Sequence, residues 1–122
     1  MRILVVGGNP EGSRKKALRT LVPKALQAMR ASAVLTQGIG TVQSVAEDYA
    51  KDAELEHIQY VQRVGHQEPI DIVAWQIAKH GKADLAIGFW PTPLQRQLLE
   101  ELAALGVQVV SSAAPGKAFA PL

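Results

Sequence analysis

The sequence predicts an α/β fold built on a single, doubly wound, mainly parallel five-stranded sheet. Five short apolar runs alternate with four segments of helical periodicity in the order βαβαβαβαβ. Such alternation with short connections implies right-handed crossovers between parallel strands. The 122 residues, 48% of them hydrophobic, suit one domain. None of them is cysteine, so the fold depends on apolar packing and not on disulfides or thiolate metal sites.

The five predicted strands are short, and two of them are almost entirely apolar. They span residues 2–6, 33–36, 57–61, 83–87 and 107–111. The first and fourth are nearly continuous apolar runs, as expected of strands that are covered on both faces. We therefore expect helices on both sides of the sheet, in a Rossmann-like arrangement.

The first two predicted helices each have one apolar arc. The first runs from Ser13 to about Arg30, and its proline, Pro23, predicts a kink or a restart because proline lacks the backbone N–H. The second runs from Thr41, a plausible N-cap, to about Lys51. The inner residues are Leu18, Leu21, Val22, Ala25, Leu26 and Met29 in the first helix, and Val42, Val45, Ala46 and Tyr49 in the second.

The third predicted helix begins near Pro69, ends at Gly81 and is apolar on more than one side, because Ile72 and Trp75 lie away from its main apolar arc. An isolated apolar stripe on a small domain is often buried by a second copy, so we expect a homodimer. The fourth helix runs from Pro93 to Leu105, and its predicted inner residues are Leu94, Leu98, Leu102 and Leu105.

Residues 1–122 are expected to form one Rossmann-like domain, in which 113–122 is a loose tail or an apolar strap. The apolar run at the start, residues 3–6, is far shorter than the roughly 20 residues of a membrane span, and no signal-like segment follows a basic start. A cytoplasmic protein without a membrane partner is the expectation.

Charge is distributed unevenly along the chain. The formal net charge is +2, but seven basic residues and one acidic residue up to Arg30 give this part +6, while six basic and ten acidic residues give the remainder −4. A solvated helix face is the commonest reason for such a run. The alternatives are an anionic ligand near the first helix, or a nucleic-acid or protein interaction module that uses this basic helix.

The carboxyl ends of the strands are the predicted place of a binding site, because loop amides and helix N-termini converge there in open parallel sheets. Four loops form this rim: 7–13, 37–41, 62–68 and 88–92. The candidate ligand-binding residues on them are Gly8, Asn9, Gly12, Ser13, Arg14, Gly38, Gly40, Thr41, Arg63, Gly88, Trp90 and Thr92.

Two of these loops leave alternatives open. The first, GGNPEGSRKK, either holds an anion on free amides and Arg14 or is a plain strand-to-helix turn that needs glycine. It is not a P-loop, because Ser13 and Arg14 stand where lysine and a hydroxyl residue are required. In the fourth loop, Trp90 either stacks on a base or packs over the sheet rim, which is the commoner role of an indole.

The stretch from Val34 to Ala50, VLTQGIGTVQSVAEDYA, resembles the strand, glycine turn and small-residue helix of the SLOG superfamily, which includes the LOG enzymes and DprA-type domains. The resemblance implies a Rossmann-like nucleotide-binding domain. LOG-type members carry a further motif, PGGxGTxxE, whose glutamate is catalytic. This chain has GFWPTPLQR at 88–96 instead, and with Thr92 aligned to the motif threonine, Gln95 replaces the glutamate. A glutamine cannot do the proton transfer of a carboxylate.

These observations favour binding over catalysis. The leading hypothesis is a sensor or sequestering protein for a nucleotide or another phosphorylated small molecule, with no cofactor, no metal and no assigned catalytic residue. A nucleoside-processing enzyme that cleaves a glycosidic bond with Glu68 or Glu100 is the second hypothesis. The interaction module on the basic first helix is the third.

Overall fold

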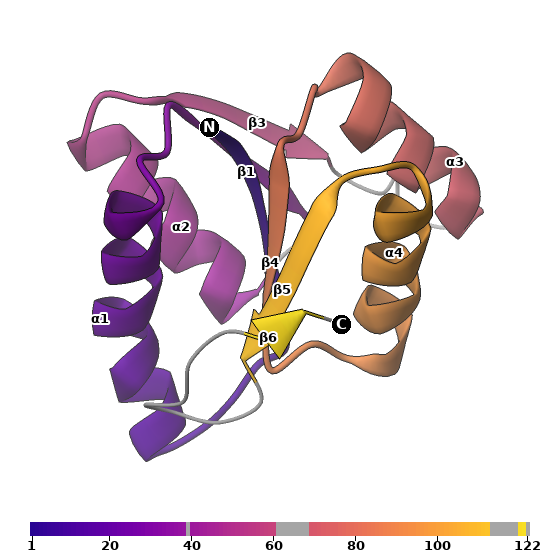
Figure 1. The fold of residues 1–122 in the computed structure, drawn as a ribbon. Helices are drawn as coiled ribbons and strands as arrows, with labels where there is room; N and C mark the ends of the chain where they lie inside the picture. Colours follow the sequence, from indigo (N-terminus) through magenta and orange to yellow (C-terminus); the bar gives the residue numbers. More distant parts are fainter. Residues whose placement is uncertain (39, 61–68, 113–119, 122) are drawn as a thin grey trace.

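The computed structural model describes residues 1–38, 40–60, 69–112 and 120–121, and it confirms the predicted architecture (Figure 1). Parallel strands lie in the order β3-β2-β1-β4-β5, and β6 pairs with β5 in the antiparallel direction. This is a Rossmann-like order, in which the strand order reverses between β1 and β4. The strands are β1 (Arg2–Gly7), β2 (Ala33–Gln37), β3 (Glu56–Tyr60), β4 (Leu85–Phe89), β5 (Gln108–Ser112) and β6 (Ala120–Pro121).

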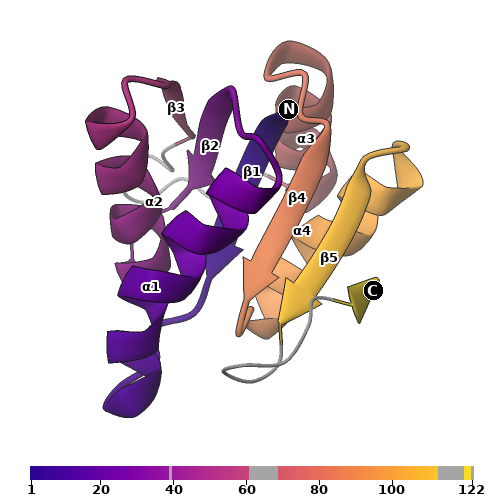
Figure 2. The same ribbon diagram turned by 60° about the vertical axis from the view of Figure 1, so that its left-hand side comes forward.

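Helices cover both faces of the sheet, as Figure 2 shows. On one face lie α1 (Ser13–Ala28) and α2 (Thr41–Asp52). On the other lie α4 (Pro93–Ala104) and α3 (Ile70–Trp75), which continues as the π-helical segment η1 (Gln76–His80). Within the described ranges, no helix has the length and apolarity to cross a bilayer.

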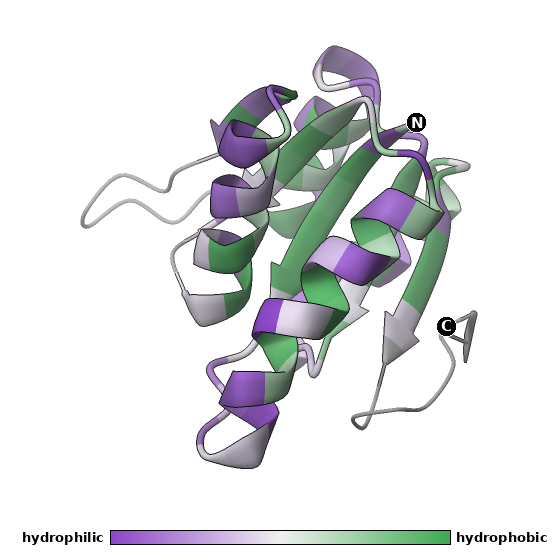
Figure 3. Ribbon diagram, turned by 90° about the vertical axis from the view of Figure 1, so that its left-hand side faces the viewer, coloured by the Kyte–Doolittle hydropathy of each residue, from purple (hydrophilic) through white to green (hydrophobic). Residues whose placement is uncertain are grey.

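The two cores meet at the central strands. In β1, Ile3 and Val5 pack under α1 and α2, while Leu4 and Val6 pack under α3 and α4, and all four are fully buried. This double coverage explains why β1 reads as a continuous apolar run. Figure 3 shows the apolar strands enclosed by helices whose outer sides are hydrophilic.

Three features differ from the sequence predictions. The restart expected at Pro23 does not occur, because α1 is continuous from Ser13 to Ala28 and is held by buried side chains on both sides of the proline. Leu94 was expected inside, but it lies 48% exposed in the first turn of α4, and Leu99 is buried. The tail contributes Ala120–Pro121 as a sixth strand, while residues 113–119 and 122 lie outside the described part.

Candidate functional site

The carboxyl end of the central strand is held by two glutamines. The carbonyl oxygen of Gly7 accepts a hydrogen bond of 2.8 Å from Nε2 of Gln95 and a longer one, 3.4 Å, from Nε2 of Gln43. The Gln43 side chain is buried and also donates to the carbonyl oxygen of Gln37 at the end of β2, at 3.2 Å. Each glutamine is the third residue of its helix. The starts of α2 and α4 are therefore both attached to the end of β1.

The loops after β1 and β4, where Rossmann-like domains usually bind ligands, are joined by backbone hydrogen bonds. The N–H of Gly8 donates to the carbonyl oxygens of Phe89 at 3.3 Å and Trp90 at 3.0 Å. A Cβ on Gly8 would lie 2.7 Å from the oxygen of Trp90, and one on Gly88 would lie 2.9 Å from Cδ1 of Leu99. Gly8 thus permits the close approach of the Trp90 carbonyl, and Gly88 permits the close packing of Leu99 from α4.

The loop after β4 is occupied by packing and helix capping. Trp90 is half-buried against the core under α1 and α2, which agrees with the packing alternative. Its backbone φ is 48°, and its buried indole N–H has no hydrogen-bond partner among the residues that the structure describes. Thr92 and Gln95 form a capping box at the start of α4: Thr92 Oγ1 accepts from the N–H of Gln95 at 3.2 Å, and the N–H of Thr92 donates to Gln95 Oε1 at 3.0 Å. The side chain of Gln95 thus has structural hydrogen bonds on both its nitrogen and its oxygen.

The start of α1 is exposed, and no side chain of the described part of the protein caps it. Gly12 is the N-cap residue with φ 67°, and the first turn contains no acidic side chain. Ser13 and Arg14 follow, both exposed, and so are Lys15 and Lys16. This end of the helix combines free N–H groups with several cations, so it attracts anions.

The start of α2 is tied to the first loop by Asn9. Oδ1 of Asn9 accepts a hydrogen bond of 3.1 Å from the N–H of Thr41. Gly40 lies between two amide oxygens, because a Cβ there would be 2.8 Å from Asn9 Oδ1 and 2.9 Å from Gln43 Oε1. That oxygen of Gln43 is buried and has no hydrogen-bond partner within the described ranges. Gly38 has φ 79° and donates to the carbonyl oxygen at the end of β3.

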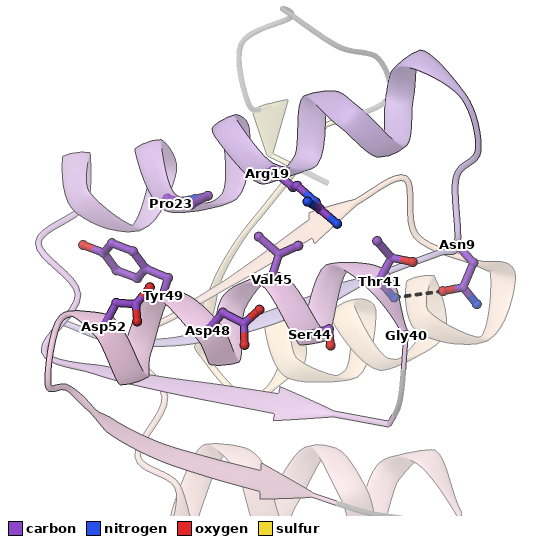
Figure 4. Close-up of a pocket in the computed structure, with 10 residues that line it drawn as sticks. All are labelled: Asn9, Arg19, Pro23, Gly40, Thr41, Ser44, Val45, Asp48, Tyr49 and Asp52. Atoms are coloured by element: carbon purple, nitrogen blue, oxygen red, sulfur yellow. Dashed lines mark hydrogen bonds between the residues drawn. The ribbon is translucent and has the colours of Figure 1, made fainter.

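A groove of about 830 Å³ begins at this point and continues between α1 and α2 (Figure 4). Asn9 and Thr41 lie at one end and Asp52 at the other, with Arg19 extending from α1 toward α2 between them. The lining residues are Asn9, Arg19, Pro23, Gly40, Thr41, Ser44, Val45, Asp48, Tyr49 and Asp52.

The charges in this groove are separated and unpaired. Arg19 comes from α1, whereas Asp48 and Asp52 lie one turn apart on α2. Within the described part of the chain, none of the three forms an ion pair or a side-chain hydrogen bond. The groove thus offers a guanidinium and two carboxylates to a ligand, beside the hydroxyls of Ser44 and Tyr49.

A second polar cluster lies under α2 and is structural. The hydroxyl of Thr36 donates to Oε1 of Glu47 at 3.2 Å and lies 3.1 Å from Nε2 of His57, which is 3.8 Å from the same carboxylate. Thr36 is fully buried, so its hydroxyl cannot reach a ligand. The cluster attaches the edge strand β3 to α2.

The structure brings three of the predicted site residues into the groove: Asn9, Gly40 and Thr41. The others lie nearby in different roles, namely Gly8, Gly88, Trp90 and Thr92 at the β1–β4 contact, Gly12, Ser13 and Arg14 at the start of α1, and Gly38 in the turn before α2. Arg63 lies outside the described residues. The sequence analysis missed Arg19, Asp48 and Asp52.

Comparisons with protein-family models, curated proteins and solved structures give no match to this chain. In the described segments, no group of three or more His, Asp or Glu side chains is arranged to hold a metal ion. Any proposal on function therefore starts from the groove itself.

Proposed function

We propose that the protein binds a small phosphorylated molecule that also carries hydroxyl groups, such as a nucleotide or a sugar phosphate, in the groove between α1 and α2. One observation supports this most directly: the unpaired guanidinium of Arg19 and the unpaired carboxylates of Asp48 and Asp52 line a single groove that begins at the start of α2. The positive charge on the α1 wall favours an anionic group of the ligand, and the negative charges on the α2 wall favour its hydrogen-bond donors.

The phosphate belongs at the Asn9 end. A guanidinium binds a phosphate through two parallel hydrogen bonds, and Arg19 projects into this half of the groove (Figure 4). The hydroxyls of Thr41 and Ser44 add donors, and the positive end of the α2 dipole lies beside them.

The hydroxyl-bearing part belongs at the opposite end. Asp48 and Asp52 accept hydrogen bonds from sugar hydroxyls, and their charge repels a phosphate. Val45 and the ring of Tyr49 supply apolar surface for the face of a sugar or base. The ligand thereby has a single favoured direction in the groove.

The role that suits this site is sensing or sequestering. The SLOG-like stretch, Val34–Ala50, contains most of the α2 wall of the groove, which supports a nucleotide-like ligand. The position of the family's catalytic glutamate holds Gln95, whose amide bonds to Gly7 and Thr92. Glu100, the carboxylate of the enzyme hypothesis, lies on α4 at the other face of the sheet from the groove, and Glu68 lies outside the described residues.

Isothermal titration calorimetry tests the proposal with ribose phosphate, adenosine monophosphate, ribose and inorganic phosphate at low salt. We expect the first two to bind at least tenfold more tightly than ribose or inorganic phosphate alone. No heat with any of the four in the wild-type protein refutes the proposal. Chromatography of the recovered ligand distinguishes binding from catalysis, because a glycosidic-bond enzyme releases free base.

Three variants locate the ligand. Arg19→Gln removes a charge-assisted interaction of about 1.5–3 kcal/mol, so the affinity for ribose phosphate should fall roughly 10-fold to 100-fold. Asp48→Asn combined with Asp52→Asn should weaken ribose phosphate but not inorganic phosphate. Lys24→Gln is the matched control, because it removes a charge from an exposed position on α1 outside the groove. Equal losses in Lys24→Gln and Arg19→Gln would contradict a specific site.

Nucleic-acid binding is the second candidate, and the exposed, uncapped start of α1 with Arg14, Lys15 and Lys16 favours it. Contacts with several phosphates would make the affinity fall steeply as salt rises. This candidate is rejected if Lys15→Gln shifts DNA in a gel as strongly as the wild type does. It is also rejected if the wild type gives no shift at low salt.

A further inference from the structure

Two apolar side chains on the outward side of α3, Ile72 and Trp75, form an apolar stripe without a partner in the described structure. Ile72 is 46% exposed and Trp75 is 47% exposed, whereas Val73, Ala74 and Ile77 on the inner side are buried. This stripe lies on the face of the sheet opposite to α1 and α2 (Figures 1 and 2). Its occupant is therefore independent of the ligand groove and of the function proposed for it.

A small hollow of about 350 Å³ lies beside Trp75. Asp71, Ile72 and Trp75 of α3 line one side of it, and Glu101 and Leu105 line the other. The Trp75 ring is held by an edge-on contact with the ring of His80, with centroids 5.0 Å apart. An oriented tryptophan next to a concave apolar surface is typical of the centre of a protein interface.

The charges along this stripe are arranged so that the stripe is complementary to itself. Asp71 precedes Trp75 by four residues, Lys79 follows it by four, and all three are exposed. Four residues make close to one full turn both in the α-helix α3 and in the π-helical segment η1, so the three side chains lie on about the same side. Two copies that cross in antiparallel directions at Trp75 would therefore place each Asp71 opposite the other copy's Lys79. Neither residue has an ion pair within the described ranges.

We propose that the protein forms a symmetric homodimer through α3 and η1, with the two-fold axis beside Trp75. Each Trp75 fills the hollow of the other copy, and two Asp71–Lys79 pairs flank the apolar centre. A two-fold contact requires that each residue match its counterpart reciprocally, and this spacing meets that requirement. A basic partner of another kind would use Asp71 and Glu101 but would leave Lys79 facing a like charge.

Charge exchange tests the geometry, with sedimentation velocity over a concentration series as the measurement. Asp71→Lys alone and Lys79→Asp alone each place like charges opposite one another, so dimerisation should weaken roughly tenfold or more. The two single variants mixed together should associate as the wild type does, because each supplies the charges that the other needs. The double variant Asp71→Lys with Lys79→Asp should also dimerise.

All these positions are exposed, so circular dichroism should show folded protein in every case. Lys24→Asp on α1 is the control and should dimerise as the wild type does. A wild-type protein that stays monomeric over the whole series overturns the proposal. Single variants that dimerise as the wild type does also overturn it. A mixture of the two single variants that fails to associate overturns it as well, because Asp71 and Lys79 would then not lie opposite each other in the dimer.

Discussion

Gln95→Glu isolates the hydrogen bond that joins α4 to the end of β1. In the wild type, Nε2 of Gln95 donates to the carbonyl oxygen of Gly7 at 2.8 Å, and Oε1 accepts from the N–H of Thr92 at 3.0 Å. Glutamate has the same shape, so one carboxylate oxygen still accepts from Thr92. The other faces the Gly7 carbonyl as a second acceptor and cannot donate.

The expected loss follows from these contacts. One net hydrogen bond contributes about 1 kcal/mol, and a carbonyl left poorly satisfied costs about 1–3 kcal/mol. The residual bond from Gln43 to Gly7, at 3.4 Å, keeps this cost near the lower end. A negative charge in the first turn of α4 returns about 0.3–1 kcal/mol through the helix dipole. The net loss is about 1–1.7 kcal/mol, and with an unfolding entropy of ~2.1 cal/mol/K per residue over the 122 residues, Tm falls by about 4–7 °C.

Lowering the pH should restore part of the stability that Gln95→Glu loses. A protonated carboxyl can donate to the Gly7 carbonyl, so folding raises the pKa of the introduced group above its ordinary value of about 4.3. The stability that this bond contributes is therefore present below the ordinary pKa and is lost as the pH rises through the folded-state pKa. Thermal unfolding of Gln95→Glu at neutral pH and near ~pH 4 measures the difference.

Gln97→Glu is the control, because it adds the same charge to an exposed position of α4. We expect it to change Tm by no more than a degree or two at either pH, as is usual for surface substitutions. A Tm loss in Gln95→Glu that equals the control, or that is the same at both pH values, would refute the role assigned to the Gly7 bond.

Two further variants test other parts of the structure. Gly40→Ala places a Cβ within 3 Å of Asn9 Oδ1 and Gln43 Oε1, so the Asn9–Thr41 bond should break and urea denaturation should show a loss of about 1–3 kcal/mol; an unchanged midpoint contradicts this. Burial raises the pKa of Tyr60 above its ordinary 10.0, opposed by Arg2, so its contribution is present below pH 10 and is lost as the pH rises through the folded-state pKa. In Tyr60→Phe, the free energy of unfolding should therefore fall less steeply above pH 10 than it does in the wild type. An equally steep fall in both proteins would contradict this role of Tyr60.

Much of the fold could be predicted because each element has a local signal. The runs at β1 and β4 are buried on both faces, so almost every residue there is apolar. The fourth helix was predicted to begin at Pro93, and α4 does begin there, with Thr92 and Gln95 forming a capping box. Pro23 was misleading because tertiary packing on both sides of the proline compensates for the missing hydrogen bond in α1.

The site was harder to predict because its charged residues have no local signal. Arg19 and Asp48 lie on helices and have the periodicity of solvated side chains, so only the packing of α1 against α2 brings them into one groove. Glycine is ambiguous for a related reason. At Gly8 the missing side chain lets the carbonyl of Trp90 approach, and the same residue type would equally let a phosphate approach.

The hydrogen bonds at the end of β1 distinguish this strand end from the groove between α1 and α2. The Gly8 N–H bonds draw the β1 and β4 loops together, and Gln95 joins α4 to the same strand end. A ligand that used the Gly8 N–H or the Gln95 amide would compete with these bonds, whereas the Thr41 hydroxyl and the Arg19 guanidinium, which line the groove, have no such bonds among the described residues. A polar ligand is therefore expected on one face of the sheet. The opposite face, where Trp75 is exposed, remains free for a second copy of the chain.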